Sequence, residues 1–341
     1  MEKIRLGRTG LMVTRCGFGA LPIQRVDMAN AREILVKAYE AGINFYDTAR
    51  AYSDSEIKLG EALSRVRKNI IIATKTHARD RETFFKHLET SLKNLKTDYI
   101  DILQLHNVPE MPDFEDPDGL YGAMMEAKKK GMIRFAGMTN HRLYMAEGTI
   151  ASGKFDTLQF PLNFLSAEKD LALIESCKAK DVGVIAMKGL SGGLITNAAA
   201  TFAFLRQYDN VVPIWGIQRM HELEEFLTLE KNPPVLDEAM WKIIEADRKE
   251  LSGGFCRSCG YCMPCPEGIQ IPTAARIVLL MNRAPYQQFL TETFKAQMDL
   301  VEECQECGQC KEKCPYELDT PELLRQNLKG YRELVRKYSE G

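Results

Sequence analysis

The stretch NIIIATKTHARDRETFFKHLETSLKNLKTDYIDILQLH, residues 69–106, shows the pattern that decides the fold. Its two ends, 69–75 and 99–106, are short apolar runs rich in isoleucine, and such runs predict strands. Between them, residues 81–95 place five apolar side chains on one stripe, as an amphipathic helix does: Phe84, Phe85, Leu88, Leu92 and Leu95. The stretch is therefore expected to fold as a strand, a helix and a second strand.

The same alternation continues on both sides of this unit. Further strands are expected at 13–20, 44–49, 134–140, 157–163, 183–188 and 211–216, and further helices at 30–41, 55–65, 119–130, 167–180 and 197–207. Eight strand–helix units over about 200–250 residues predict a (β/α)8 barrel of the TIM type. A doubly wound sheet is the alternative, but it would carry G-x-G-x-x-G after its first strand, and residues 16–20 read CGFGA.

The bulk composition leaves room for one large domain and one small domain. The 341 residues carry 45 Lys and Arg against 47 Asp and Glu, so the net charge of −2 gives no reason to expect nucleic acid or an anionic membrane as a partner. The N-terminal residues MEKIRLGRTG contain no apolar signal region, so a cytoplasmic protein is expected. We expect a barrel over 1–235, a connecting helix over 236–252 and a second domain over 253–341.

Polar side chains follow three neighbouring strands of the predicted barrel, at the point where each apolar run ends. They are Asp47 and Tyr52 for the second strand, Lys75 for the third and His106 for the fourth. Barrel enzymes carry their chemistry at the C-terminal ends of the strands. We therefore expect these four side chains to converge on one mouth.

These four residue types together suit the protonation of an alkoxide. Tyrosine has an ordinary pKa of about 10, and a nearby ammonium favours the tyrosinate and lowers that pKa. A carboxylate beside the lysine keeps it charged and oriented, and a neutral histidine can donate a hydrogen bond to a carbonyl oxygen. Such a set can protonate the alkoxide that forms when a hydride reaches the carbonyl carbon.

The same residues resemble the aldo-keto reductases. NFYDTA at 44–49, ATK ending at residue 75 and LH at 105–106 match segments of that family in the same order, and the resemblance covers residues 1 to about 230. It implies a nicotinamide-dependent oxidoreductase of carbonyls or alcohols. In such an enzyme Tyr52 is the general acid and base, Lys75 tunes it, Asp47 orients Lys75, and His106 positions the carbonyl.

The resemblance also implies where the nicotinamide is held. GMTN at 137–140 and a glutamine on the sixth strand would bind the carboxamide through Thr139, Asn140 and Gln159. At the position where the family stacks an aromatic ring on the nicotinamide, this chain has Met187.

Phosphate binding is expected in the loops after strands seven and eight, as in many barrels. These loops read KGLSGG at 188–193 and GIQR at 216–219, and their glycines expose backbone N–H groups that can approach a pyrophosphate. The residues expected to bind the cofactor there are Lys188, Gly189, Leu190, Gly192, Gly216, Gln218 and Arg219. NADP and NAD both remain open, because the lysine and arginine with which the family usually binds the 2′-phosphate are not evident here. Arg219 is the nearest basic candidate.

Eight of the ten cysteines form two runs near the C-terminus. The second run, C-x2-C-x2-C-x3-C-P, holds a [4Fe–4S] cluster in bacterial ferredoxins, and here it contains Cys304, Cys307, Cys310 and Cys314. The first run has a last spacer of two residues and contains Cys256, Cys259, Cys262 and Cys265. Zinc is the main alternative, but a zinc site does not use a third cysteine in the same run. Disulfides are disfavoured in a reducing cytoplasm.

The cysteine region resembles the α-helical two-cluster ferredoxins. The 38 residues between Cys265 and Cys304 are too many for a compact β-type ferredoxin and are expected to be helical on both sides of Pro285. In two-cluster ferredoxins the fourth cysteine of each run ligates the other cluster. The resemblance thus implies one cluster on Cys256, Cys259, Cys262 and Cys314, and another on Cys304, Cys307, Cys310 and Cys265. A barrel fused to such a module matches a known bacterial and archaeal subgroup of the family.

Two functions follow from these features. The first is a nicotinamide-dependent oxidoreductase that carries two [4Fe–4S] clusters for electron transfer or sensing. The alternative is a ferredoxin-type electron-transfer or redox-sensing protein whose barrel is a cofactor-binding or docking platform, because nicotinamide gives two electrons as hydride whereas a cluster passes them singly. The expected partners are a small carbonyl or alcohol substrate and a redox protein, either a ferredoxin or a flavoprotein.

Overall fold

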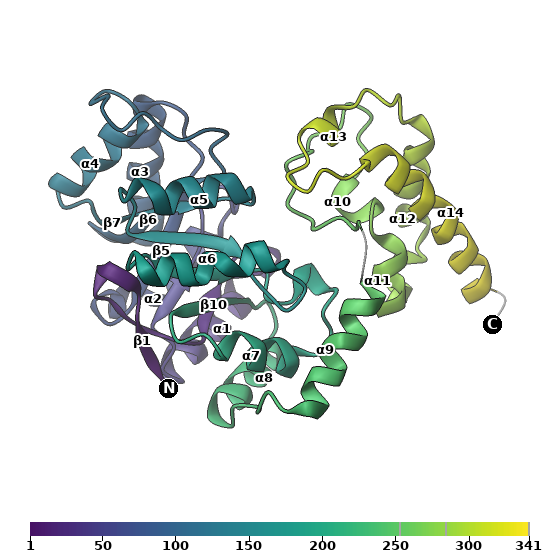
Figure 1. The fold of residues 1–341 in the computed structure, drawn as a ribbon, viewed down its shortest axis with the longest axis horizontal. Coiled ribbons are helices and arrows are strands. Elements are labelled where there is room, and N and C mark those ends of the chain that lie inside the picture. Colours follow the sequence, from purple (N-terminus) through teal and green to yellow (C-terminus); the bar gives the residue numbers. More distant parts are fainter. Residues whose placement is uncertain (252–253, 284, 340–341) are drawn as a thin grey trace. The chain divides into compact units, whose positions relative to one another are not determined.

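The computed structural model describes residues 1–251, 254–283 and 285–339, and its first part is a closed parallel barrel (Figure 1). The strands follow one another around the barrel in the order β10-β3-β4-β5-β6-β7-β8-β9. Their bounds are β3 (Gly17–Gly19), β4 (Phe45–Asp47), β5 (Ile71–Thr76), β6 (Ile100–His106), β7 (Ile133–Thr139), β8 (Thr157–Pro161), β9 (Gly183–Met187) and β10 (Val211–Gly216). The predicted (β/α)8 fold is therefore confirmed.

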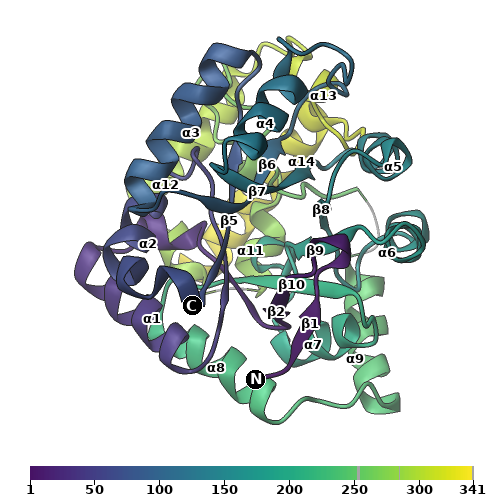
Figure 2. The ribbon, with the colours of Figure 1, turned by 90° about the vertical axis from the view of Figure 1, so that its left-hand side faces the viewer.

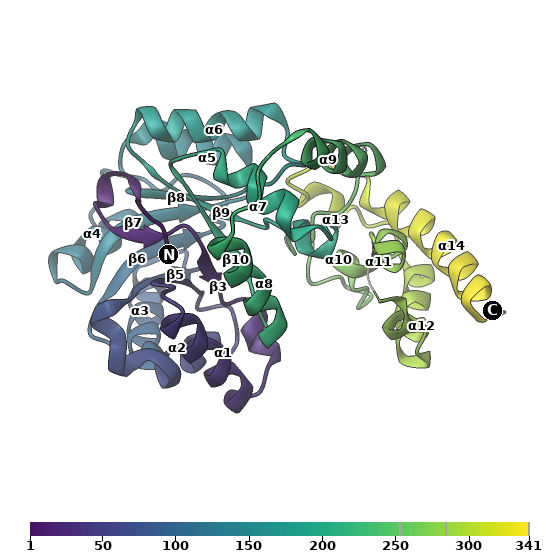
Figure 3. The same cartoon turned by 90° about the horizontal axis from the view of Figure 1, so that it is seen from below.

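One helix follows each barrel strand and packs outside it (Figures 2 and 3). The helices are α1 (Met28–Glu40), α2 (Ser55–Leu63), α3 (Arg81–Leu95), α4 (Leu120–Lys129), α5 (Leu143–Ser152), α6 (Glu168–Ala179), α7 (Ala198–Arg206) and α8 (Met220–Lys231). Helix α3 has the bounds expected from its apolar stripe, and it starts where the Asp80 carboxylate accepts from the N–H of Thr83 at 2.8 Å.

The strand expected at 13–20 is two strands with different partners. β1 (Lys3–Arg5) and β2 (Met12–Thr14) form an antiparallel hairpin, whereas β3 begins at Gly17 and belongs to the barrel. The expectation was wrong because the spacing of apolar residues does not show that the chain leaves the hairpin after Thr14 and enters the barrel at Gly17.

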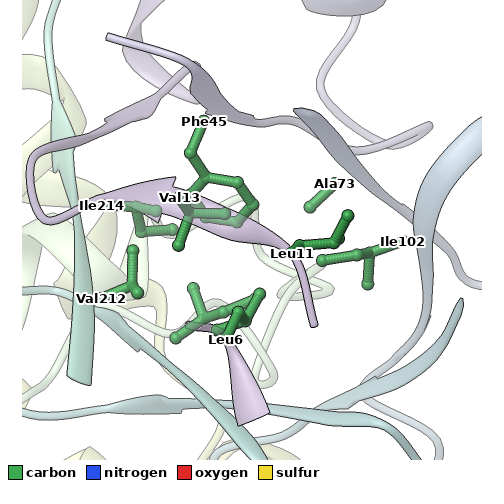
Figure 4. Packing of buried hydrophobic residues seen from close by; sticks show 9 residues of the cluster. Leu6, Leu11, Val13, Phe45, Ala73, Ile102, Val212 and Ile214 are labelled. Carbon is green, nitrogen blue, oxygen red and sulfur yellow. The ribbon is translucent and has the colours of Figure 1, made fainter. Parts of the chain in front are cut away.

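The hairpin closes the end of the barrel at which the strands begin. Figure 4 shows its side chains packed against residues that point inward from the barrel strands: Leu6, Leu11 and Val13 against Phe45, Ala73, Ile102, Val212 and Ile214. Ile185 of β9 belongs to the same cluster, and all nine of its members are buried. Because one end is filled by apolar side chains, the polar strand ends face the opposite end.

The C-terminal residues form helices, as expected between the two cysteine runs. They are α9 (Glu238–Glu250), α10 (Ile271–Ala274), α11 (Ile277–Arg283), α12 (Glu292–Asp299), α13 (Gln309–Glu312) and α14 (Thr320–Ser339), and no strand occurs in 254–283 or 285–339. Asn327 of α14 ties this group together by donating to the carbonyl oxygen of Ala275 and accepting from the N–H of Val278, both at 3.2 Å. No helix in the described residues is long and apolar enough to span a membrane.

The chain divides into two compact groups of residues. One contains Met1–Gly189 and Ala199–Trp241, and the other contains Leu190–Ala198 together with the residues from Lys242 onward. The segment that follows β9 thus makes its contacts within the C-terminal group. The expected boundary at 252–253 lies outside the described residues, and the expected limits of the domains stay predictions.

Replacing Leu6 by Ala is expected to destabilise the barrel by about 2–5 kcal/mol, because it opens a cavity in the cluster of Figure 4. Met12 lies on the same hairpin but is 49% exposed, so Met12→Ala should change the free energy of unfolding by less than about 0.5 kcal/mol. Urea unfolding followed by tryptophan fluorescence measures both. Equal effects of the two substitutions would show that the hairpin does not anchor the barrel.

Candidate functional site

The structure brings the four predicted polar side chains together at the C-terminal ends of β4, β5 and β6. Asp47 and His106 are the last residues of β4 and β6, and Lys75 is the last but one of β5. Parallel pairing aligns Asp47 with Ala73 and Lys75 with Gln104, so Asp47 and Lys75 project from adjacent strands. Tyr52 reaches the same place from the turn after β4, where its N–H bonds to the carbonyl oxygen of Ala49 at 3.0 Å.

A buried ion pair forms the centre of this group. Nζ of Lys75 donates to Oδ1 of Asp47 at 2.5 Å and to the carbonyl oxygen of Thr48 at 2.7 Å, and the Lys75 side chain is 1% exposed. Burial by itself lowers the pKa of Lys75, but the charges of Asp47 and Tyr52 and their hydrogen bonds outweigh burial and raise it. Lys75 is therefore an ammonium at neutral pH.

Tyr52 lies against this ammonium but keeps its proton. Nζ of Lys75 is 5.1 Å from the centroid of the Tyr52 ring and hydrogen-bonds to its hydroxyl. Burial raises the pKa of Tyr52, and the charge of Lys75 lowers it by less, so the net pKa lies above the ordinary value. The expectation of a lowered pKa was wrong because it did not include burial. A neutral phenol suits a proton donor.

His106 is held in its neutral form. Burial, followed by the charges of Lys75, His77 and Arg79, lowers the pKa of His106 to about 3. Its ring meets the Tyr52 ring edge to face, with 6.0 Å between the centroids. Within the described part of the chain, Nδ1 of His106 is buried without a hydrogen-bond partner. A neutral imidazole retains one N–H donor for a substrate oxygen.

Gln104 belongs to this group but was missed by the sequence interpretation. Its Nε2 donates to Oδ2 of Asp47 at 3.4 Å and to Oε1 of Gln159 at 2.7 Å, and the side chain is completely buried. The signal was present, because alternation along a strand places Gln104 on the same face as His106. Gln104 and Gln159 orient the carboxylate that orients Lys75.

Two of the residues expected to bind the carboxamide, Thr139 and Gln159, are paired on neighbouring strands. Thr139 ends β7 and is buried, and Gln159 of β8 contacts Gln104 and Asp47. The Asn140 side chain donates to the carbonyl oxygen of Val108 at 3.0 Å and accepts from the N–H groups of two following residues, His141 and Arg142. Asn140 thus holds the loop itself, and its role toward the carboxamide stays a prediction.

The loop after β9 contains three left-handed residues. Lys188, Ser191 and Gly192 have φ values of 59°, 48° and 66°, a conformation that occurs in anion-binding turns. The binding of a phosphate by this loop stays a prediction. Gly189 packs so closely on Trp215 that an added Cβ would lie 2.5 Å from the indole ring. Met187 is half-buried at the end of β9.

The loop after β10 already has a carboxylate at its N–H groups. Oε2 of Glu222 accepts from the N–H of Gln218 at 2.8 Å and from that of Arg219 at 3.1 Å. Arg219 is exposed at the start of α8, next to the exposed Gly216. A phosphate that used these N–H groups would displace Glu222, which makes this loop the less favourable of the two for an anion.

The two cysteine runs repeat the same backbone turns. Ser258 and Glu306, each preceding the second cysteine of its run, have φ values of 53° and 51°. Gly260 and Gly308, each following that cysteine, have φ values of 82° and 78°. The shortened spacer of the first run contains a cis peptide bond before Pro264. The backbone of the two runs therefore turns in the same way around the second cysteine.

Two cavities in the C-terminal group bring cysteines of both runs together. One, of about 230 Å³, is lined by cysteines 304, 307 and 310 of the second run and by cysteines 262 and 265 of the first. The other is lined by cysteines 256, 259 and 262 of the first run and by cysteines 310 and 314 of the second. Each cavity thus receives the fourth cysteine of the opposite run, the arrangement that crossed ligation requires.

The donor set suits an iron–sulfur cluster. Burial and the neighbouring Cys256 and Cys259 raise the pKa of Cys262 to about 12, so thiolates packed this closely need bound cations to balance their charge. Each cavity offers four or more sulfur donors, and iron–sulfur clusters are held by cysteine thiolates.

Comparison with known proteins identifies both parts of the chain. The model of the aldo/keto reductase family matches residues 15–202, and that of the 4Fe-4S dicluster domain matches residues 255–319. The first match covers more than half of the 341 residues. The chain therefore belongs to the aldo/keto reductase family and carries a C-terminal 4Fe-4S dicluster domain.

Individual relatives agree with this assignment. The chain is 32% identical to the L-galactose dehydrogenase of Arabidopsis thaliana over 221 residues, which is 58% of this chain and 67% of that protein. It is 29% identical to the aldo-keto reductase YhdN of Bacillus subtilis, over 58% of this chain and 64% of that protein. The matched region thus spans about two thirds of each relative.

A solved structure supports the fold. An aldo-keto reductase from Bacillus halodurans in its holo form superimposes with a TM-score of 0.64 at 22% identity, covering 72% of this chain and 96% of that one.

Crossed ligation predicts that Cys265→Ser damages the cluster of the opposite run. Cys265 lines the cavity of Cys304, Cys307 and Cys310, so this variant should lose iron from that site and keep the cluster of its own run. Cys314→Ser is the matched control and should show the reverse. Iron analysis and EPR spectra of anaerobically purified protein measure both variants, and two complete clusters in the wild type would give about 8 irons. Damage confined to each mutated run would contradict crossed ligation.

Proposed function

We propose that the chain is a nicotinamide-dependent oxidoreductase that interconverts carbonyls and alcohols, and that its dicluster domain holds two [4Fe–4S] clusters. The observation that carries the proposal is the group at the ends of β4, β5 and β6: an ammonium on Lys75, a neutral Tyr52 and a neutral His106. These are the protonation states that reduction of a carbonyl requires. Membership of the aldo/keto reductase family supports the same reaction.

Each side chain has one task in this reaction. The N–H of His106 donates to the carbonyl oxygen and positions it, and the hydroxyl of Tyr52 gives its proton to that oxygen as negative charge develops. Lys75 stabilises the tyrosinate that remains, and Asp47 holds Lys75 in place. The nicotinamide, when bound, supplies the hydride to the carbonyl carbon, so the products are the alcohol and the oxidised nicotinamide.

The nicotinamide cofactor is proposed from the loops at the same end of the barrel. Within the barrel group, Lys188 after β9 has a left-handed φ of 59°, Thr139 ends β7, and Gln159 of β8 is paired with Thr139 beside the catalytic group. Glu222 disfavours a further phosphate near Arg219, because its carboxylate already accepts the local N–H groups. Among the two nucleotides, this arrangement favours NAD over NADP.

The substrate is proposed as a small organic carbonyl compound or alcohol. The named activity of the Arabidopsis thaliana relative, L-galactose dehydrogenase, supports oxidation of an alcohol as the reverse reaction. The clusters pass single electrons, so we propose a ferredoxin or flavoprotein as the partner that exchanges electrons with them.

Tyr52→Phe is expected to reduce turnover of a model aldehyde by about 10²–10⁴-fold, because the variant has no proton to transfer. Binding of NADH and NADPH, followed by quenching of protein fluorescence, should be unchanged. Tyr46→Phe is the matched control, since Tyr46 is buried on β4 and its hydroxyl donates to the carbonyl oxygen of Ile43 at 3.1 Å, away from the mouth. Full activity of Tyr52→Phe would favour an electron-transfer protein instead.

The pH profile of aldehyde reduction is expected to be flat from about pH 5 to pH 9 and to fall only above about pH 10. The protonated phenol is the active form, and the raised pKa of Tyr52 extends it into the alkaline range. His106, with a pKa of about 3, adds no acidic limb in this window. Alcohol oxidation needs the tyrosinate and should increase toward alkaline pH. Steady-state kcat in both directions tests this, and a fall in reduction near pH 7 would contradict it.

A further inference from the structure

Two arginines of the C-terminal group hold the segment that follows β9. Nη1 of Arg276 donates to the carbonyl oxygen of Gly192 at 3.0 Å, and Nη1 of Arg283 donates to that of Leu194 at 2.8 Å. All four residues lie in one compact group. Both side chains thus donate a hydrogen bond to a backbone carbonyl oxygen of the same segment, and substitutions of the two can be compared directly.

The two arginines differ in the balance of their charge. Arg283 is paired with the carboxylates of Asp247 at 2.9 Å and Glu250 at 3.0 Å. Arg276 is 8% exposed and donates through Nε to the carbonyl oxygen of Pro272 at 3.0 Å, and no carboxylate of the described residues pairs with it. A buried guanidinium without a counter-ion is strongly unfavourable. An anion is therefore expected close to Arg276.

Cys256 lies close to Arg276, because both contact one carbonyl oxygen. Its Sγ is 4.0 Å from the same Pro272 carbonyl oxygen that accepts from Arg276. Burial lowers the pKa of Arg276, and the charge of Cys256 acts in the opposite direction. A cluster held by four thiolates is an anion that becomes more negative on reduction, and surrounding charge is one of the factors that set its potential.

The two cavities also differ in their other charged residues. The cavity with Cys256 is lined by Arg257, whose guanidinium lies 3.8 Å from the centroid of the Phe255 ring. The cavity with Cys304 is lined by Glu267 and by Glu306, and the carboxylate of Glu306 is paired with Arg325. Cations favour the reduced state of the first cluster, and the negative charge of Glu267 disfavours the reduced state of the second.

We propose that Arg276 is the buried counter-charge of the cluster on Cys256, Cys259, Cys262 and Cys314, and that it makes this cluster the one of higher potential. The inference rests on the proposed crossed ligation. Because a buried charge is screened little by salt, Arg276 outweighs the surface carboxylates in separating the two potentials. At equilibrium, an electron that enters the domain then resides mainly on the Cys256 cluster, so this cluster is reduced before the other one.

Redox titration of the anaerobic full-length protein, followed by EPR, tests the order. Arg276→Gln should make reduction of the higher-potential cluster at least tenfold less favourable, which lowers its reduction potential by about 59 mV for one electron. The potential of the other cluster should not change. Cys256→Ser, which replaces a ligand of the same cluster, should perturb the same signal. Arg276→Lys keeps the charge and should keep the wild-type potential. Arg283→Gln releases the same segment and should shift neither potential.

Several outcomes overturn the proposal. The proposal fails if Arg276→Gln shifts the potentials of both clusters or of neither. It also fails if Arg283→Gln shifts the potential as much as Arg276→Gln does, or if Arg276→Lys lowers the potential as much as Arg276→Gln does. If Arg276→Gln binds less iron than the wild type, Arg276→Lys is the deciding variant. A cluster potential below the wild-type value in Arg276→Lys would show that the charge of residue 276 is not the cause of the higher potential. A wild type with fewer than about 8 irons instead disproves the two-cluster assignment itself.

Discussion

The ion pair between Lys75 and Asp47 is the interaction on which the mouth of the barrel depends. Two charges in an apolar interior are tolerated only when they lie close together and their remaining hydrogen-bonding groups are satisfied. Here Asp47 and the carbonyl oxygen of Thr48 accept hydrogen bonds from the ammonium of Lys75, and Gln104 donates a hydrogen bond to the second oxygen of the carboxylate. Burial is the largest cause of the pKa shifts of both neighbours, and the same ammonium further lowers the pKa of His106 and limits the rise in that of Tyr52. Burial and one contact between two adjacent strands thus act together on three protonation states.

Charge balance also matters at the proposed cluster sites of the C-terminal group, where the ligands are cysteine sulfurs rather than oxygens. The matched turns around Ser258 and Glu306 give both runs one local shape, and the cavities mix cysteines of the two runs. Charged neighbours then distinguish sites that are alike in their ligands. Arg276 also bonds to Gly192, so the segment after β9 and the surroundings of Cys256 share one guanidinium.

Much of the fold and part of the candidate site were predictable from local pattern. Alternating apolar runs located the strands and helices, because their spacing repeats with the period of each structure. The prediction of one strand at 13–20 was wrong because periodicity does not show which partner a strand pairs with, and Thr14 and Gly17 pair with different strands. The prediction of a lowered pKa for Tyr52 was wrong because the effect of burial depends on packing by residues far away in sequence. Gln104 was overlooked although it alternates with His106 along β6.

By itself, the sequence determined the residue types that carry chemistry, their order and their positions at strand ends, since these follow from local spacing. The spacing of the cysteines likewise determined the kind of domain that follows the barrel. Only the tertiary structure decided which groups meet: Gln104 with Asp47, Glu222 with the N–H groups after β10, and Arg276 with Gly192 and the surroundings of Cys256. The reason is physical, because protonation and charge balance depend on burial and on distances between residues that are remote along the chain.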